Sequence, residues 1–275
     1  MRDFFSFSSS SLPESTRVLG FRGTEALSRP YLFEIYLSIP SEESGDIDLD
    51  DVIGAKGTLR AQREDDGEQY LIHGVFAGIE LVHQVGNAAM FHATLVPRFW
   101  ELTQTLHSRI FTKKSVKEII EFILEDSGFS GDDFALKLYA DYEPEEHVCQ
   151  YQESDLDFIS RWMEREGIYY YFEQGEDCEK LIITDHRSFH QPSRKAAVPY
   201  HPVMGGDTNA GESFDSFMCR HKQLPAAVRL NDYDYNNPTL DVTGEASVSR
   251  SGFGEITMHG ARFFTPGAGK RLAQL

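Results

Sequence analysis

The chain of 275 residues has little cysteine, no long apolar run and few basic residues. Cys149, Cys178 and Cys219 are widely spaced and form no CxxC pair, which argues against a disulfide framework and a zinc knuckle. We expect them to be buried, reduced thiols. No stretch approaches the ~20 apolar residues that span a bilayer, and the N-terminus leads into serines instead of the apolar core of a signal peptide. The sequence therefore predicts no membrane-spanning segment and synthesis in the cytoplasm.

The shortage of basic residues decides which partners are excluded. Asp and Glu number 44 against 26 Lys and Arg, which gives a formal net charge of -18. A charge of this sign repels phosphate backbones and anionic lipid, so nucleic acid and anionic membranes are not expected partners. It also keeps a component of a large assembly soluble.

The composition itself is that of a folded protein, since 40% of the residues are hydrophobic and 25% are charged. A chain of this length is expected to divide into two or three domains. The serine run Ser6–Ser11 and the acidic stretch Glu42–Asp51 are strongly polar, and we interpret them as a terminus and a surface loop.

Short β-type runs dominate residues 1–99, which predicts a first β-barrel domain. Two dipeptides, Asp66-Gly67 and Gly86-Asn87, are typical of tight hairpin turns. Between residues 90 and 96 apolar and polar side chains alternate, which puts one face of a strand inward. The predicted strands are Val18–Phe21, Tyr31–Ile39, Gly57–Arg63, Tyr70–Val85 and Ala88–Pro97.

Residues 100–211 are expected to form an α+β domain followed by a linker from Gln191 to Gly211. Its first helix begins at a capping box of Ser115 and Glu118. A second helix begins at Ser154 and ends at Gly167. The strands Ile168–Phe172 and Lys180–Asp185 are then predicted to form a hairpin. The apolar faces of the helices comprise Val116, Ile119, Ile120, Ile123 and Leu124 in the first and Leu156, Ile159, Trp162 and Met163 in the second.

Residues 212–275 are expected to start a second, truncated β-barrel. The predicted strands are Glu212–Arg220, Ala227–Leu230 and Glu245–Arg250, and Thr265-Pro266 opens a terminal helix. The fold class is therefore mainly β with an α+β insertion.

A metal site is not expected, although His186 and His190 stand four residues apart. That spacing places two ligands on one face of a helix, but the pair lacks the glutamate of an HExxH motif. Ser188 and Pro192 favour a loop at this point. No cofactor-binding pattern, P-loop or nucleophile elbow occurs in the sequence.

Catalytic residues are not expected either. Glu153, Asp155 and Asp157 could be imagined as paired carboxylates for glycoside cleavage, but they lie where a helix begins, and capping explains them. Cys149 has His147 two residues away, a spacing that alone does not define a nucleophile. The aromatic run Tyr169–Phe172 lies among acidic residues, which favours a packed strand over a base-stacking platform.

Five segments, which follow one another in the order that one family shows, give the chain a resemblance that covers nearly all of it. They are residues 21–33 (FRGTEALSRPYLF), 108–111 (SRIF), 149–172 (beginning CQYQESDLDFISR), 230–235 (LNDYDY) and 260–264 (GARFF). In this respect the chain resembles the hub portion of the VgrG family, the spike proteins of type VI secretion systems, which are similar to phage tail hubs. Trp162 replaces the leucine expected there.

The resemblance implies a homotrimeric spike that adapts a hexameric Hcp-like tube to a puncturing needle, with no enzymatic activity and no cofactor. A PAAR-type tip and effectors would bind through segments absent from these residues, and the assembled machine would secrete or inject the protein. Glycines are expected at turns, and Tyr151 and Phe158 in packing positions. The family-motif residues matched here are Gly23, Ser28, Arg109, Phe111, Gln150, Tyr151, Glu153, Ser154, Asp155, Phe158, Arg161 and Gly167.

Two alternatives remain open. A tail hub from a phage or phage-like particle would share the architecture but have other partners. A peptidoglycan-degrading enzyme would need a carboxylate pair in a cleft.

Overall fold

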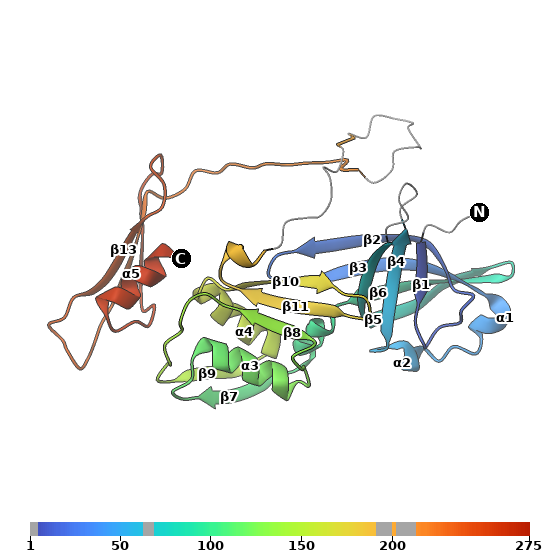
Figure 1. Ribbon diagram of the computed structural model, residues 1–275, viewed down its shortest axis with the longest axis horizontal. Coiled ribbons are helices and arrows are strands. Elements are labelled where there is room, and N and C mark those ends of the chain that lie inside the picture. Colours follow the sequence, from blue (N-terminus) through green and yellow to red (C-terminus); the bar gives the residue numbers. More distant parts are fainter. Residues whose placement is uncertain (1–4, 63–68, 191–199, 202–212) are drawn as a thin grey trace. The chain divides into compact units, whose positions relative to one another are not determined.

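The computed structural model describes residues 5–62, 69–190, 200–201 and 213–275, which belong to two compact units. The larger unit carries β1 to β11 and the smaller carries β12 to β14 with a terminal helix (Figure 1). Each unit is described by itself. Among the described helices, none is both long and apolar enough to cross a membrane. The predicted domain boundaries at residues 99 and 211 stay predictions.

The larger unit begins with a six-stranded antiparallel sheet. Phe5 and Phe21, on the two outermost strands, meet with ring centroids 5.1 Å apart, so the sheet curls until its edges approach. No ladder joins these two strands within the described residues, and the sheet is a half-barrel. Its order is β1 (Phe5–Ser8), β4 (Lys56–Gln62), β5 (Gln69–Val85), β6 (Ala88–Val96), β3 (Arg29–Pro40) and β2 (Arg17–Ala26).

The strand predictions for this sheet are confirmed from residue 17 onward. Phe91, Ala93 and Leu95 are buried, as the alternation along β6 predicts. Gly86, at φ 59°, joins β5 to β6 in the predicted two-residue turn. The other predicted turn, Asp66-Gly67, lies outside the described residues.

Two polar stretches were wrongly assigned. The serine run begins inside β1, because Phe7 is buried in the core and β1 pairs with β4. The acidic stretch forms two short helices, α1 (Ser41–Ser44) and α2 (Leu49–Val52). Val52 is fully buried and Asp48 caps α2. In both stretches buried apolar side chains anchor the polar residues around them, with Ile47 and Leu49 packing on the same core as Val52.

The prediction that Gly23 lies at a turn is also wrong. It lies inside β2, opposite Phe33 on β3. A Cβ at Gly23 would clash with the ring of Phe33. The glycine is needed for this close approach, and the turn after β2 is made by Leu27 and Ser28 instead.

The α+β part of the larger unit packs two helices against a three-stranded sheet of order β10-β11-β8. The predicted capping box of Ser115 and Glu118 is confirmed, and the apolar faces of both helices are buried. The elements are η1 (Arg98–Gln104), β7 (His107–Phe111), α3 (Val116–Asp126), β8 (Phe134–Lys137), β9 (Val148–Glu153), α4 (Asp155–Arg165), β10 (Tyr169–Gln174), β11 (Glu179–Thr184) and η2 (Arg187–Phe189).

Hydrogen bonds join the half-barrel to this α+β part. The N–H of His73 donates to Oε1 of Gln174 at 3.0 Å, and Nε2 of His73 lies 3.1 Å from the carbonyl oxygen of Gly175. Within the half-barrel, the buried hydroxyl of Tyr31 donates to the carbonyl oxygen of His73 at 2.5 Å. Burial raises the pKa of Tyr31 far above its ordinary value. The rings of Tyr31 and Phe172 pack edge to face, 5.0 Å apart. The two parts therefore share a continuous interior.

The smaller unit is a three-stranded sheet with one helix. β12 (Ala227–Asp232) lies between β13 (Val242–Ser247), antiparallel to it, and β14 (Glu255–His259), parallel to it. Thr265 caps α5 (Pro266–Gln274) and Pro266 begins it, as predicted. β14 was not predicted, and β13 begins before the predicted residue 245.

The predicted strand Glu212–Arg220 is wrong for its described residues 213–220, which form no strand. Phe217 and Met218 are 77% and 75% exposed, so the apolar residues that suggested the strand have nothing to pack on. The thiols also differ from expectation, because Cys149 and Cys219 are exposed and Cys178 is half-buried. On β9, Val148 and Gln150 face inward, which turns Cys149 outward.

Two glycines on β5 make a matched test of the close packing in the half-barrel. A Cβ at Gly74 would clash with the carbonyl oxygen of Val96, whereas one at Gly78 meets nothing within 4 Å. We expect Gly74→Ala to destabilise the protein by about 2 kcal/mol and Gly78→Ala to change stability by less than about 0.5 kcal/mol. Urea unfolding midpoints measure both. Equal midpoints would contradict the packing described here.

Candidate functional site

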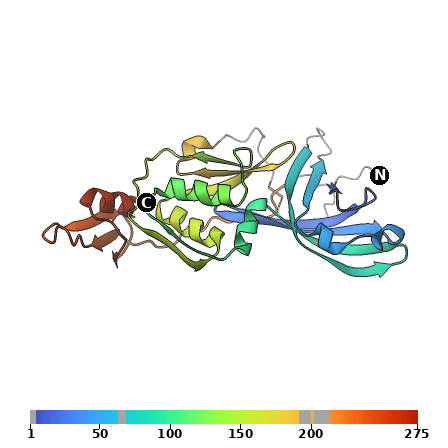
Figure 2. The same cartoon turned by 90° about the horizontal axis from the view of Figure 1, so that it is seen from below.

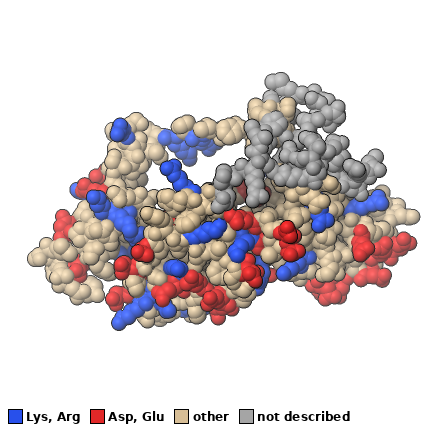
Figure 3. All heavy atoms as spheres, viewed as in Figure 1, with Lys and Arg blue, Asp and Glu red and all other residues tan. Residues whose placement is uncertain are grey.

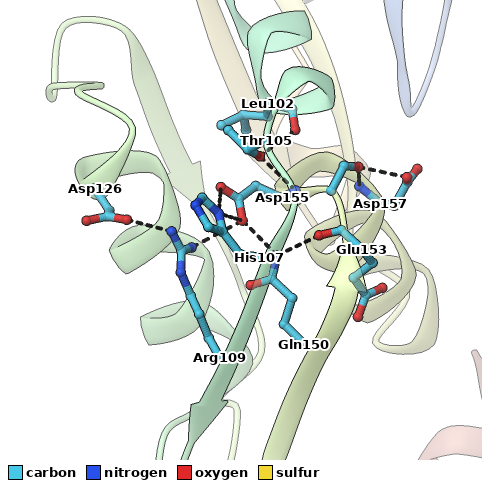
Figure 4. Close-up of polar contacts among 10 residues, drawn as sticks. Leu102, Thr105, His107, Arg109, Asp126, Gln150, Glu153, Asp155 and Asp157 are labelled. Atoms are coloured by element: carbon cyan, nitrogen blue, oxygen red, sulfur yellow. Dashed lines mark hydrogen bonds and ion pairs between the residues drawn. The ribbon is translucent and has the colours of Figure 1, made fainter.

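The matched family residues concentrate where β7 pairs with β9 and where β9 leads into α4. The two strands are antiparallel, with Arg109 opposite Gln150 and Phe111 opposite Val148. Their register places polar side chains around the first turn of α4 (Figure 4). The arrangement is a polar cluster backed by the apolar interior of the α+β part.

Ser154 begins α4 by capping it reciprocally with Asp157. Its hydroxyl oxygen accepts from the N–H of Asp157 at 3.0 Å and donates to Oδ2 of the same residue at 2.7 Å. The helix ends at Gly167, whose φ of 69° is left-handed, and the N–H of Ile168 donates back to the carbonyl oxygen of Met163 at 2.8 Å. Both ends of the helix are thus satisfied by local contacts.

Asp155 is the centre of the cluster, with only 1% of its side chain exposed. Its carboxylate accepts from Nε2 of Gln150 at 2.7 Å, from Nδ1 of His107 at 3.1 Å and from Nη1 of Arg109 at 3.1 Å (Figure 4). Its N–H donates to the hydroxyl of Thr105 at 3.2 Å. Capping, which the sequence analysis offered for this carboxylate, is therefore wrong for Asp155, whose carboxylate accepts from side chains of β7 and β9.

These donors keep the buried carboxylate ionised. Burial alone raises the pKa of Asp155, but the hydrogen bonds from Gln150, His107 and Thr105 and the charge of Arg109 outweigh it. The pKa of Asp155 consequently lies below its ordinary value of 3.8.

Arg109 extends the cluster to α3. Its guanidinium also donates from Nη2 to Asp126 at 2.7 Å, so one side chain on β7 bridges the end of α3 and the start of α4. Gln150 is completely buried, and its Nε2 donates in addition to the carbonyl oxygen of Glu153 at 3.2 Å. The cluster ties four segments together through two donor side chains.

Glu153 and Arg161 form a second, more exposed pair. Nε and Nη2 of Arg161 donate to the two carboxylate oxygens at 2.9 and 2.7 Å, and Nη2 also reaches the carbonyl oxygen of Cys149 at 2.9 Å. The hydrogen bond from Arg161 lowers the pKa of Glu153. The guanidinium lies 5.2 Å from the ring centroid of Phe158, which holds it over the apolar layer.

Aromatic packing lies beneath these polar contacts. Phe158 is fully buried and stacks on Phe111 with centroids 5.8 Å apart. Tyr151, expected in a packing position, is instead 69% exposed, because it follows Cys149 on the outward face of β9. Tyr151 therefore contributes little to the interior.

Ser28 and Gly23 lie apart from the cluster, on the hairpin of β2 and β3. Ser28 adopts a left-handed φ of 56°, and its N–H donates to the carbonyl oxygen of Tyr170 at 2.9 Å. It joins the half-barrel to β10. The family-motif residues thus divide between a cluster at α4 and a contact at this hairpin, and their roles stay proposals.

Sequence reasoning missed Thr105, His107 and Asp126. One signal was available, because His107 and Arg109 are two residues apart on a strand and so share a face. Asp126 and Thr105 carry no such signal, since only the fold brings the end of α3 and the end of η1 to this face.

A hollow of about 330 Å³ opens beside the cluster. It is lined by Glu101, Leu102, Thr105, His107, Arg109, Asp126, Ser127, Phe129 and Asp155. Within the described ranges, no group of three or more His, Cys, Asp or Glu side chains could hold a metal ion. His186 and His190 are engaged separately, with Ser188 at 2.8 Å and with the hydroxyl of Tyr169 at 2.7 Å.

Comparison with known families assigns the chain. Residues 24–275 match the family described as phage tail baseplate hub (GPD). The chain belongs to this phage tail baseplate hub family.

Relatives of known name come from type VI secretion. The type VI secretion system spike proteins VgrG1b and VgrG1a of Pseudomonas aeruginosa are each 34% identical to this chain, over 83% and 86% of its length. The matched parts make up 30% and 36% of those proteins, so the chain spans about a third of the length of these relatives.

A solved structure supports the fold. The E. coli c3393 protein, described as a component of the type VI secretion system with structural similarity to the T4 bacteriophage tail proteins gp27 and gp5, is 27% identical. It superposes with a TM-score of 0.62 over 68% of this chain and 51% of its own.

The cluster predicts a large difference between two aspartates that share Arg109. Asp155→Asn leaves buried donors without a charged acceptor, and we expect it to lower the free energy of unfolding by about 3 kcal/mol. Asp126→Asn changes a half-exposed pair and should cost less than about 1 kcal/mol. Chemical denaturation of both variants measures the difference. A cost for Asp155→Asn no larger than that for Asp126→Asn would disprove the central place of Asp155.

The lowered pKa of Asp155 also predicts how stability depends on pH. A carboxyl whose folded pKa is depressed contributes stability that is complete above its unfolded pKa, about 4, and is lost as the pH falls through the folded value. Below about pH 4 the protein should therefore lose stability more steeply than Asp155→Asn. Unfolding curves at stepped pH test this, and parallel losses in the two proteins would refute it.

Proposed function

We propose that this chain is the hub part of a spike in a bacterial contractile injection machine of the type VI secretion class. Three copies of the full protein associate, and each supplies two β units, so that three-fold symmetry at the needle meets six-fold symmetry at an Hcp-like tube. The observation that carries the proposal is the hub-family match over residues 24–275. A β unit at each end of the chain agrees with it.

The proposal extends to partners and location. A puncturing needle, a PAAR-type tip and effectors bind through parts of the longer protein outside these residues. The protein assembles in the cytoplasm and leaves with the tube when the machine contracts. Nucleic acid is not among the partners, since the charge of -18 repels it.

The role is structural and not enzymatic in this proposal. A glycosidase needs a general acid with a raised pKa beside a second, accessible carboxylate. The pKa of Asp155 is lowered and its side chain is 1% exposed, while Asp157 is engaged with Ser154. These contacts support a structural role, in which the carboxylates stabilise the fold.

One observation favours the enzyme alternative. Glu101 lines the hollow beside Asp155, and burial raises its pKa, with Glu179 adding to the effect and Arg98 opposing it. Asp155 is inaccessible, so of the two carboxylates Glu101 and Asp155 only Glu101 would be able to reach a substrate. Release of soluble fragments from peptidoglycan that disappears in Glu101→Gln, with folding intact, would establish an enzyme.

A phage or phage-like tail hub remains the alternative within the same family. It would have the same fold and a different tube protein. The genes beside this one distinguish the two, because a type VI locus encodes an Hcp-like tube and a phage locus encodes head and tail proteins.

The hub proposal predicts the mass of the protein in solution. Light scattering should find this chain monomeric or weakly associated, and a version continuing through the second barrel and needle should be trimeric. The trimer should bind hexameric Hcp-like protein from the same locus. A longer version that stays monomeric and ignores the tube would refute the proposal.

A further inference from the structure

The second half of β5 has a free edge. β4 pairs with β5 only as far as Val75, whereas β6 pairs with it from Val75 to Val85. From Gly78 to Val85, β5 thus has a partner strand on one side only within the described part of the chain. In Figure 2 the hairpin of β5 and β6 projects at the end of the half-barrel.

This edge carries few of the features that prevent strand addition. An unpaired edge offers a row of N–H and C=O groups, which proteins commonly block with lysine or proline. Residues 78–85 contain neither, and Glu80 is the single charged residue besides the titratable His83. Leu81, Val82 and Val85 are 46%, 49% and 62% exposed. Two register shifts, at Phe76/Gly78 and Leu81/His83, are the protective feature that the edge does carry, and the second leaves Val82 without a partner residue on β6.

Acidic residues border the edge at both of its ends. Phe76, just before it, exchanges backbone hydrogen bonds with Gly54 and Ala55, which follow α2, at 2.9 and 3.0 Å. Beyond its far end, the carbonyl oxygen of Asn87 accepts from the N–H of Ser41 in α1 at 2.8 Å. The segment between these contacts carries the exposed side chains of Glu42, Asp46, Asp48, Asp50 and Asp51. Figure 3 shows acidic atoms gathered at this end of the half-barrel.

We propose that residues 78–85 bind an extended segment of another protein by strand addition, and that this segment alternates apolar with basic side chains. Backbone hydrogen bonds supply the binding, and alternate side chains supply the selectivity. The acidic α1–α2 segment selects for basic residues. The edge of a second copy fits poorly, because residues 78–85 contain Glu80 and no Lys or Arg that the acidic α1–α2 segment would select. This binding site lies beyond the hub role and does not depend on it.

A synthetic peptide of alternating valine and lysine is the first probe. We expect fluorescence anisotropy to show binding and hydrogen exchange to show added protection at residues 78–85. Two peptides serve as controls, one with glutamate in place of lysine and one methylated on every amide nitrogen, which removes the N–H donors along both edges of the strand. Neither should bind. Binding of the methylated peptide with equal affinity, or protection confined to other strands, would overturn the proposal.

Two variants of the protein test the same site. Val82→Lys places a like charge at the edge and should weaken peptide binding about tenfold or more, because like charges in contact cost several kcal/mol. Leu32→Lys, on an exposed position of β3 that pairs with Thr24 on β2, adds the same charge outside residues 78–85 and should leave binding unchanged. Equal weakening by both variants would show that the charge of the protein, and not the edge at residues 78–85, governs peptide binding, and it would overturn the proposal. Protection at 78–85 that grows with protein concentration without peptide would show a second copy there and overturn the proposal.

Discussion

A carboxylate that stays ionised inside a protein has to be surrounded by donors, and the α+β part of this chain depends on that constraint at Asp155. The donors come from β7 and β9, while the carboxylate belongs to α4. Removing such a charge from water is costly unless each lone pair finds a partner. A slip of one residue between β7 and β9 would turn donor side chains to the opposite face, so the observed register is what brings them together. We interpret the cluster as a device that selects this packing, whereas the apolar faces of α3 and α4 supply most of the stability.

The same parts explain why the larger unit suits a hub. Its half-barrel and its α+β part share an interior through Tyr31 and Phe172, and Ser28 adds a backbone hydrogen bond to β10. Force applied to either part is therefore passed through packed rings and hydrogen bonds. The charged groups around α4 are engaged with one another, as expected of groups that hold a fold together. The hub family to which the chain belongs is consistent with this reading.

Local patterns predicted the elements that are specified locally. The cap at Ser115, the alternation along β6 and the helix beginning at Pro266 each depend on residues a few positions apart. The assignments that failed depend on distant residues. β1 exists because β4 accepts it, and Gly23 is required by a ring on the next strand. Asp155 has the spacing of a capping carboxylate, and only the folded register shows His107 and Arg109 beside it.

Gly57 and Gly74 face each other on β4 and β5, at the place where the half-barrel bends toward β1. A Cβ on Gly57 would press on the ring of Phe7, and one on Gly74 would meet the backbone at Val96. Any side chain at either position would have to flatten the sheet to make room. The curvature of the half-barrel consequently depends on two residues that have no side chain. A single methyl group, added at either glycine, would open the half-barrel to a larger radius.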